Sequence, residues 1–268
     1  MRRIGPSCKT KPPACEDRLA PAWSPDGGSI AYVREWGALE IGKPWGPQGQ
    51  IANSDLYVMA ADGTDVRRVT RLSAAKPYAV DLGRPTWSPD RKHVAFEVTE
   101  SPRGTPAGKA ALFIVGTDGS GLKRLTPWKR EEAGHADFSP DGNEILFAAS
   151  PNGKGGRSGN LFEIHPDGSG LQQLTHSPSN GIVTGGSFSP DGTSIAYAQL
   201  PPGEEFLTSL YVMAADGSGA HPIAPQAAAG DIDWGPASGI SGGLVRGGRQ
   251  TWRHLARLRR VPRPVKAS

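Results

Sequence analysis

The sequence predicts an all-β protein assembled from repeats of four short antiparallel strands, and three observations predict this fold. Glycine and proline account for 36 and 25 of the 268 residues, so turns are expected to outnumber long helices. A Ser-Pro-Asp-Gly type of segment follows an aromatic residue several times along the chain. A second segment, with Asp-Gly between two short runs of strand-forming residues, recurs in step with the first. Repeats of about 40 to 50 residues with this content are typical of β-propeller blades.

Aromatic anchors set the period of the repeat. The anchors are Trp23, Trp87, Phe138, Phe188 and Trp234, and they are separated by 64, 51, 50 and 46 residues. We expect four complete four-stranded blades within residues 20–235, and the inner strand of a fifth. The blades lie near residues 20–71, 84–127, 135–176 and 185–224, and the partial one at 231–235. Propellers contain about four to eight blades, so four can close a ring, whereas an open ring would expose edges that favour self-association.

The first turn of each repeat has the residues that a tight turn needs. Proline presets φ at the first central position, aspartate tolerates the second, and glycine adopts the positive φ that ends the turn. In the second copy Arg91 replaces the glycine, which should cost about 1 kcal/mol if φ stays positive. The turn residues are Pro25, Asp26 and Gly27; Pro89 and Asp90; Pro140, Asp141 and Gly142; and Pro190, Asp191 and Gly192.

The second turn of each repeat is an Asp-Gly hairpin. It joins a third strand such as "LYVM" to a short fourth strand such as "RRVT". The second and third strands are apolar on both faces, so neighbouring blades must cover both. The turn residues are Asp62 and Gly63, Asp118 and Gly119, Asp167 and Gly168, and Asp216 and Gly217.

The coupled segments resemble the TolB-type β-propeller family, whose repeats carry W-S-P-D-G, then I-A-F or I-A-Y, then L-Y-V-M, D-G-S-G and L-T. The resemblance covers residues 21–223, and a fifth copy begins with "DIDWGPASG" at residue 231. It implies a ring that usually has six blades, so this chain would be a partial or truncated member. It also implies a periplasmic or other extracytoplasmic role with a protein partner. Similar propellers accompany prolyl-oligopeptidase-like hydrolase domains and form oligogalacturonate-lyase-like enzymes.

The two ends of the chain differ in composition from the repeats. Residues 1–19 form a Pro- and Lys-rich leader with both cysteines, Cys8 and Cys15, whose redox state stays open. No apolar segment follows its arginines, so no signal peptide is expected there. Residues 236–268 form a basic tail with eight bases and no acid, which leaves 22 bases against 26 acids elsewhere. We expect a disordered tail. The alternatives are an out-of-frame segment and contact with nucleic acid or an anionic membrane.

Strand direction indicates which face of the propeller binds a partner. The two turns of each repeat share one face, so the loops between second and third strands and the links between blades share the other. Loops on a rigid scaffold are where binding residues tend to lie. Exposed aromatic residues there can anchor a partner or a sugar ring, and polar residues are expected near the channel mouth. The candidates are Trp36, Trp45, Arg84, Trp128, His135, Asp137, Asp231 and Asp233.

The sequence predicts no catalytic constellation, metal site or cofactor. Gly239, Ser241 and Gly243 match G-x-S-x-G, but a nucleophile elbow needs a large α/β domain with a downstream Asp and His. The candidate His and Asp residues come from separate blades, without a dense cation-binding loop, and no H-x-x-x-H pair occurs. No apolar run is long enough to span a membrane. We therefore expect a non-enzymatic scaffold that binds a protein or peptide. The alternatives are a detached propeller of a prolyl-oligopeptidase-like or lyase-like enzyme, and a carbohydrate-binding propeller.

Overall fold

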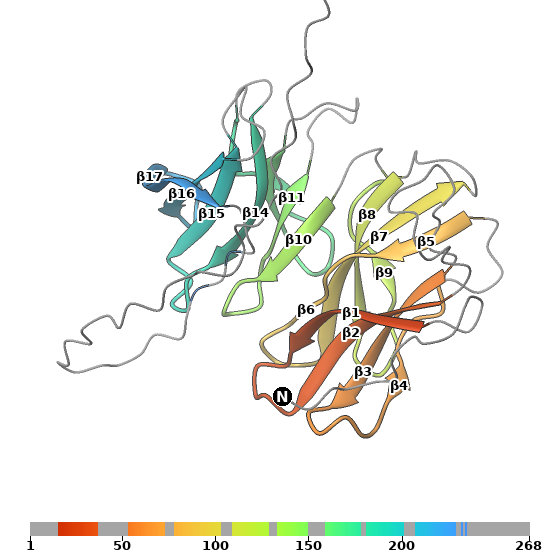
Figure 1. The fold of residues 1–268 in the computed structure, drawn as a ribbon. Coiled ribbons are helices and arrows are strands. Elements are labelled where there is room, and N and C mark those ends of the chain that lie inside the picture. Colours follow the sequence, from red (N-terminus) through yellow and green to blue (C-terminus); the bar gives the residue numbers. More distant parts are fainter. Residues whose placement is uncertain are drawn as a thin grey trace, which may run out of the picture. The chain divides into compact units, whose positions relative to one another are not determined.

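The fold is that of a computed structural model of the chain (Figure 1). The structure describes residues 16–36, 53–72, 78–102, 109–128, 133–149, 159–177, 181–200, 207–228, 232 and 234. The chain divides into two units, residues 1–236 and 237–268, and every described residue belongs to the first. The described residues form strands and no helix, which confirms the predicted all-β class. Among them, accordingly, no helix is long and apolar enough to cross a membrane.

Four antiparallel sheets follow one another along the chain, and within each sheet the strands pair in sequence order (Figure 1). The first sheet contains β1 (Glu16–Trp23), β2 (Ser29–Trp36), β3 (Asn53–Ala60) and β4 (Arg67–Arg68). The second contains β5 (Tyr78–Leu82), β6 (Thr86–Trp87), β7 (His93–Pro102), β8 (Lys109–Gly116) and β9 (Lys123–Arg124). The third contains β10 (Ala133–Phe138), β11 (Ile145–Ala149), β12 (Asn160–Ile164) and β13 (Gln172–Gln173). The fourth contains β14 (Ile182–Phe188), β15 (Ser194–Leu200), β16 (Leu207–Ala214) and β17 (His221–Ala228).

The second sheet differs from the others because its first strand is in two pieces. Both β5 and β6 pair with β7, and residues 83–85 separate them. With these two pieces counted as one strand, each of the four sheets has the four-stranded antiparallel form predicted for a blade.

The Ser-Pro-Asp turn closes the first hairpin of the first sheet through side-chain hydrogen bonds. Ser24 Oγ donates to Asp26 Oδ1 at 2.6 Å and accepts from the backbone N–H of Ser29 at 2.9 Å. Asp26 Oδ1 also accepts from the N–H of Gly28 at 3.1 Å. These bonds, from Ser24 first and Gly28 second, lower the pKa of Asp26 to about 2. The turn is therefore built around an ionised carboxylate.

The last residue of this turn has a positive φ in all four sheets. Gly27, Gly142 and Gly192 have φ of +70°, +77° and +73°, and Arg91 has φ of +63°. The arginine therefore keeps the turn at the strain cost expected for a side chain in the left-handed region. Its guanidinium also forms an ion pair with Asp26 in the turn of the first sheet.

The Asp-Gly turns place glycine where two sheets approach closely. Gly119 has φ of +89°, and a Cβ there would lie 3.0 Å from the carbonyl oxygen of Val69 in the preceding repeat. Gly217 has φ of +85°, and a Cβ there would lie 3.1 Å from the carbonyl oxygen of Leu174. Glycine is favoured at these turns for its conformation and for its lack of a side chain.

The threonine that follows the fourth strand fastens it to the third. Thr70, Thr126 and Thr175 accept hydrogen bonds through Oγ1 from the backbone N–H groups of Leu56, Leu112 and Leu161, at 3.0, 2.9 and 2.9 Å. In the first sheet the buried carboxylate of Asp55 extends this network. It accepts from Thr70 Oγ1 at 2.7 Å and from Arg68 Nη2 at 2.5 Å. The threonine of each recurring Leu-Thr or Val-Thr pair therefore hydrogen-bonds the end of the fourth strand to the third strand.

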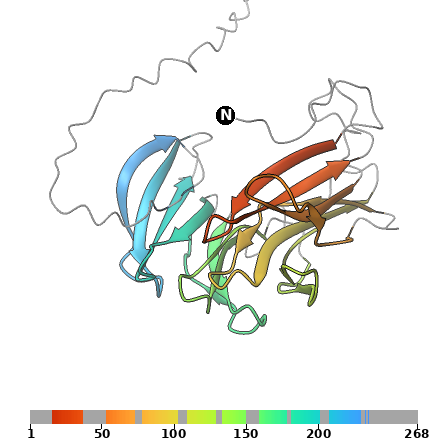
Figure 2. The ribbon, with the colours of Figure 1, turned by 90° about the horizontal axis from the view of Figure 1, so that it is seen from below.

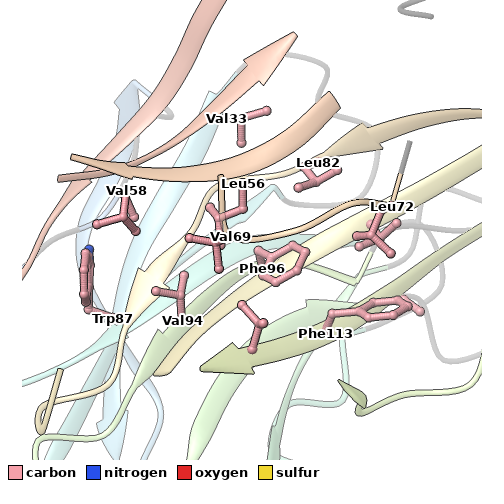
Figure 3. Packing of buried hydrophobic residues seen from close by; sticks show 14 residues of the cluster. Val33, Leu56, Val58, Val69, Leu72, Leu82, Trp87, Val94, Phe96 and Phe113 are labelled. Atoms are coloured by element: carbon pink, nitrogen blue, oxygen red, sulfur yellow. The ribbon is translucent and has the colours of Figure 1, made fainter. Parts of the chain in front are cut away.

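Each sheet has two apolar faces with different side chains. We call the face that packs on the following sheet the trailing face, and the face that packs on the preceding sheet the leading face. Between the first and second sheets, trailing residues Val33, Leu56 and Val58 meet leading residues Phe96 and Phe113 (Figure 3). Because neighbouring residues of a strand point to opposite faces, the Ile-Ala-Tyr type of repeat places its aromatic residue toward the preceding sheet.

The same packing recurs at the next two junctions. The trailing residues Ala95, Leu112 and Ile114 of the second sheet cluster with Ile145, Phe147 and Ile164 of the third. The trailing residues Leu146, Ala148 and Leu161 of the third sheet cluster with Ile195, Tyr197 and Met213 of the fourth. Figure 2 shows the strands of successive sheets following one another in this order. The core is therefore divided among the junctions between sheets.

Candidate partner-binding site

The first strand of each sheet is irregular a few residues before its aromatic anchor. Its register shifts between Leu19 and Ala22 in β1, between Gly134 and Asp137 in β10, and between Val183 and Gly185 in β14. In the second sheet residues 83–85 interrupt the strand at the same place. Bulges bend a strand and redirect its side chains, and they are frequent near functional sites. The position three residues before the anchor is occupied by Ala20, Arg84, His135 and Gly185.

Two of these residues, Arg84 and His135, are exposed and lie on neighbouring sheets. His135 has φ of +55°, a conformation that costs a non-glycine residue roughly 1–2 kcal/mol. Ala20 at the equivalent position of β1 has φ of +49°, whereas Arg84 and Gly185 do not have a positive φ, so the bulges of β1 and β10 share this conformation. A histidine where glycine would be unstrained is the kind of backbone outlier that occurs at ligand-binding positions.

Glycine on the next sheet makes room for the His135 side chain. A Cβ on Gly185 of β14 would lie 2.9 Å from His135 Cβ and 3.4 Å from its Nδ1. The imidazole of β10 therefore lies against bare backbone of β14, and a larger residue at 185 would displace it. The sequence identifies His135 as a candidate but not this contact.

Glu97 also lies in this region, although it was not predicted from the sequence as a candidate. It lies on β7, and its Oε2 would be 2.9 Å from a Cβ on Gly83 and 2.7 Å from a Cβ on Gly134. Two glycines, on either side of the junction between the second and third sheets, thus accommodate its carboxylate. The repeat alignment contains a signal for Glu97, because the same position is apolar in the other sheets, namely Val33, Ala148 and Ala198.

Asp137 ties two first strands together. Its Oδ2 accepts from the backbone N–H of Phe188 and from Ser187 Oγ, both at 2.9 Å. Elsewhere an indole makes the corresponding link. Trp87 Nε1 donates to the carbonyl oxygen of Ala22 at 3.0 Å, and Trp234 Nε1 donates to that of Ser187 at 2.9 Å. Asp137 thus has a structural role at a junction whose anchor, Phe188, lacks an indole N–H.

Trp128 lies in the link that follows β9, half-buried against the core. Its ring centroid is 5.6 Å from that of Phe113, at an interplanar angle of 58°. Lys109 Nζ and the guanidinium carbon of Arg124 each lie 5.8 Å from the Trp128 centroid. Trp128 was predicted as a candidate from the sequence, and the structure adds the two cations.

Other predicted residues fall outside the described part of the chain. Trp45, Asp231 and Asp233 are there. Trp36 ends β2, where its backbone pairs with Glu16 and Asn53, but its side chain is not among those described. Within the described residues, no group of three His, Cys, Asp or Glu side chains is placed to hold a metal ion.

An open hollow of about 600 Å³ lies on the turn face, opposite the variable loops. Glu144 and His165 line it and form a pair, with 2.8 Å between His165 Nδ1 and Glu144 Oε1. Burial raises the pKa of Glu144, partly offset by the adjacent histidine. This pair replaces the small residues Ser194 and Ala214, which pair at the equivalent place in the fourth sheet.

The TolB β-propeller domain profile matches residues 48–238, which is more than half of the chain. The chain belongs to the TolB β-propeller family. No match was found among curated proteins.

Solved structures resemble this TolB-type propeller at low sequence identity. TolB from Acinetobacter baumannii aligns with a TM-score of 0.52 and 22% identity over 78% of this chain and 44% of its own. An oligogalacturonate lyase from Vibrio parahaemolyticus aligns with a TM-score of 0.53 and 16% identity over 77% of this chain and 53% of its own. Prolyl oligopeptidase B from Galerina marginata aligns with a TM-score of 0.52 and 18% identity over 80% of this chain and 32% of its own. These similarities show the fold, and the chain spans about half or less of each protein's length.

Proposed function

We propose that this TolB-type propeller is a non-enzymatic interaction scaffold that binds a protein or peptide through its variable loops and the bulges of its first strands. The observation that carries the proposal is the pair Arg84 and His135, exposed at equivalent positions on neighbouring sheets. Both precede the aromatic anchor, so they lie toward the end of the strand that is opposite the Ser-Pro-Asp turn. That end is shared with the loops between second and third strands.

The sheets supply a rigid frame for such a surface. The turns, the Leu-Thr pairs and the apolar junctions fix the strands, while Gly83, Gly134 and Gly185 accommodate Glu97 and His135. Binding residues on a scaffold that does not rearrange avoid much of the entropy cost of ordering. Family membership supports an interaction role and an extracytoplasmic location, both of which are part of the proposal.

Site-specific photocrosslinking tests the proposal. A photoreactive amino acid is placed at Arg84 or at His135 in the full chain, and the control carries it at Lys92. Lys92 is 78% exposed in the turn of the second sheet, on the opposite face. We expect the same partner to be labelled from positions 84 and 135 but not from 92. Equal labelling from all three positions would contradict a specific binding face.

A catalytic or carbohydrate-binding role is the competing hypothesis. Some structural neighbours are a lyase and a peptidase, but at these identities the similarity concerns the fold. Peptidase and polyuronate-lyase assays on the purified chain distinguish the two. Turnover that disappears in His135→Ala would refute the non-enzymatic proposal. Glycan binding lost on replacing Trp36 and Trp45 together would favour a carbohydrate-binding module.

The proposal includes self-association through Trp23, at the margin of the leading face of the first sheet, whose other apolar residues are buried. Trp23 is 60% exposed on β1, whereas Trp87, Phe138 and Phe188 are 7–8% exposed at the equivalent places. Each of these three anchors lies in a sheet that packs on the sheet before it, whereas the structure describes no sheet before the one that contains Trp23. Light scattering at several concentrations should show a mass that rises with concentration and a weaker rise for Trp23→Ser. A constant monomer mass would refute self-association and leave the binding face untouched.

A further inference from the structure

Lys109, Arg124 and Trp128 form a compact group on the second sheet. Lys109 begins β8, Arg124 lies in β9, and Trp128 follows in the link to the third sheet. Both cationic groups lie 5.8 Å from the centroid of the Trp128 ring. Lys109 and Arg124 are exposed, and Trp128 is half-buried.

The core holds the tryptophan in place. Its ring packs on Phe113, which is 8% exposed and belongs to the cluster between the first and second sheets (Figure 3). Phe113 also pairs with Arg124 across β8 and β9. The core thus fixes the aromatic ring, and strand pairing places the Arg124 backbone beside Phe113.

Electrostatics determines what such a group binds. Two like charges near one ring repel each other, and the cation–π attraction that offsets this is about 0.5–1 kcal/mol per cation at exposed sites. An anion that contacts both cations would relieve the repulsion and accept charge-assisted hydrogen bonds, which are stronger than neutral ones. With two cations near the ring and Phe113 packed on it, stacking on a sugar is less favoured than charge recognition.

We propose that Lys109, Arg124 and Trp128 form a subsite for the carboxylate side chains of an acidic segment in a partner protein. The inference rests on the proposed function, since β8 begins at the loop face and the link with Trp128 lies there. It adds that the partner presents acidic side chains to this one place on the loop face. Glu100 pairs with Lys109 across β7 and β8, so its charge weakens the subsite for an anion.

Nuclear magnetic resonance of the ¹⁵N-labelled full chain tests the subsite, with a synthetic octaglutamate peptide as the probe. The indole N–H signal of Trp128 is identified by its absence in Trp128→Phe. We expect this signal to shift saturably as the peptide is added. Binding of the peptide to the basic tail would instead shift the signal of Trp252, so the two events are separated within one spectrum.

Matched variants decide whether the two cations carry the effect. Lys109→Gln combined with Arg124→Gln should weaken the dissociation constant measured at Trp128 at least fivefold. Lys92→Gln, which removes one exposed cation on the turn face, should leave it within twofold, and Glu100→Gln should strengthen it. The dispersion of the backbone amide signals verifies that each variant is folded.

Three outcomes would overturn the inference: no shift at Trp128, a shift that persists in the folded double variant, or a larger response to oligogalacturonate than to octaglutamate. The last outcome would assign the group to a polysaccharide. None of these results affects crosslinking from positions 84 and 135, which tests the proposed function independently.

Discussion

The indole Nε1 of Trp87 donates a hydrogen bond to the carbonyl oxygen of Ala22 at 3.0 Å, and thereby joins the first strands of the first two sheets. Trp234 makes the equivalent bond to Ser187. The aromatic anchor thus packs on a neighbouring sheet and also hydrogen-bonds it. Phe138 and Phe188 at the same position provide only the packing. A phenylalanine at position 87 would therefore keep the packing and lose the hydrogen bond.

Trp87→Phe should keep the packing and lose the bond. We expect the free energy of unfolding to fall by about 1 kcal/mol, the net value of a typical hydrogen bond. Trp87→Ala should lower it by about 3–5 kcal/mol, the usual cost of deleting a large buried aromatic side chain. Urea denaturation measures both. Equal losses for the two variants would mean that the bond, and not the packing, dominates this junction.

Arg91→Gly should have an effect that depends on salt. Glycine removes the strain of φ +63°, worth roughly 1–2 kcal/mol, but it also removes the exposed ion pair with Asp26, which contributes little at the surface. Because salt screens exposed pairs, the variant should gain stability relative to the natural chain as sodium chloride rises from low concentration to about 1 M. Denaturation at both salt concentrations measures this difference. A variant less stable at both would show that the ion pair outweighs the strain.

Asp137→Ala separates the structural role of Asp137 from a binding role. The variant leaves the backbone N–H of Phe188 and the hydroxyl of Ser187 without this acceptor, so stability should fall by about 1–3 kcal/mol. Asp137→Asn keeps an acceptor oxygen, so it should lower the free energy of unfolding by less than Asp137→Ala. If Asp137→Ala unfolds like the natural chain but loses the partner, the residue belongs to the binding surface.

The turn aspartates predict a loss of stability in acid. The folded-state pKa of Asp26 and of Asp191 is lowered to about 2 from 3.8. A lowered pKa contributes stability that is fully present above the unfolded value and is lost as the pH falls toward the folded value. Unfolding free energy should therefore fall between about pH 4 and pH 2. Ser24→Ala, which removes the largest cause of the shift, should raise the pKa of Asp26 measured by carboxyl titration, while that of Asp191 stays the same.

Local chemistry explains which features could be predicted from the sequence. Pro-Asp-Gly and Asp-Gly turns depend on a few adjacent residues, so their positions follow from the sequence directly. Strand pairing follows as well, because each hairpin joins neighbours. The interruption between β5 and β6 was not predicted, although Pro85, which has no N–H to donate to the strand ladder, lies within it.

Contacts between sheets could not be predicted in the same way. Glu97 fits between Gly83 and Gly134, which lie 14 and 37 residues away in sequence, and only the fold brings them together. Within the second sheet, the two cations near the Trp128 ring, Lys109 and Arg124, are 15 residues apart in sequence and also come together only in the fold. The sequence contains a signal for Glu97, a charge at a position that is apolar in every other repeat, but the signal becomes interpretable once the faces of the sheets are known.

In the proposed function Arg84 and His135 serve binding and not folding, and His135→Gly separates the two roles. Glycine relieves the strain of φ +55° while removing the imidazole, so the two roles give opposite signs. Unfolding free energy and affinity for the crosslinked partner are measured on the same preparation. We expect equal or greater stability and an affinity at least tenfold lower. A less stable variant that binds the partner with unchanged affinity would show that His135 serves the fold and not binding.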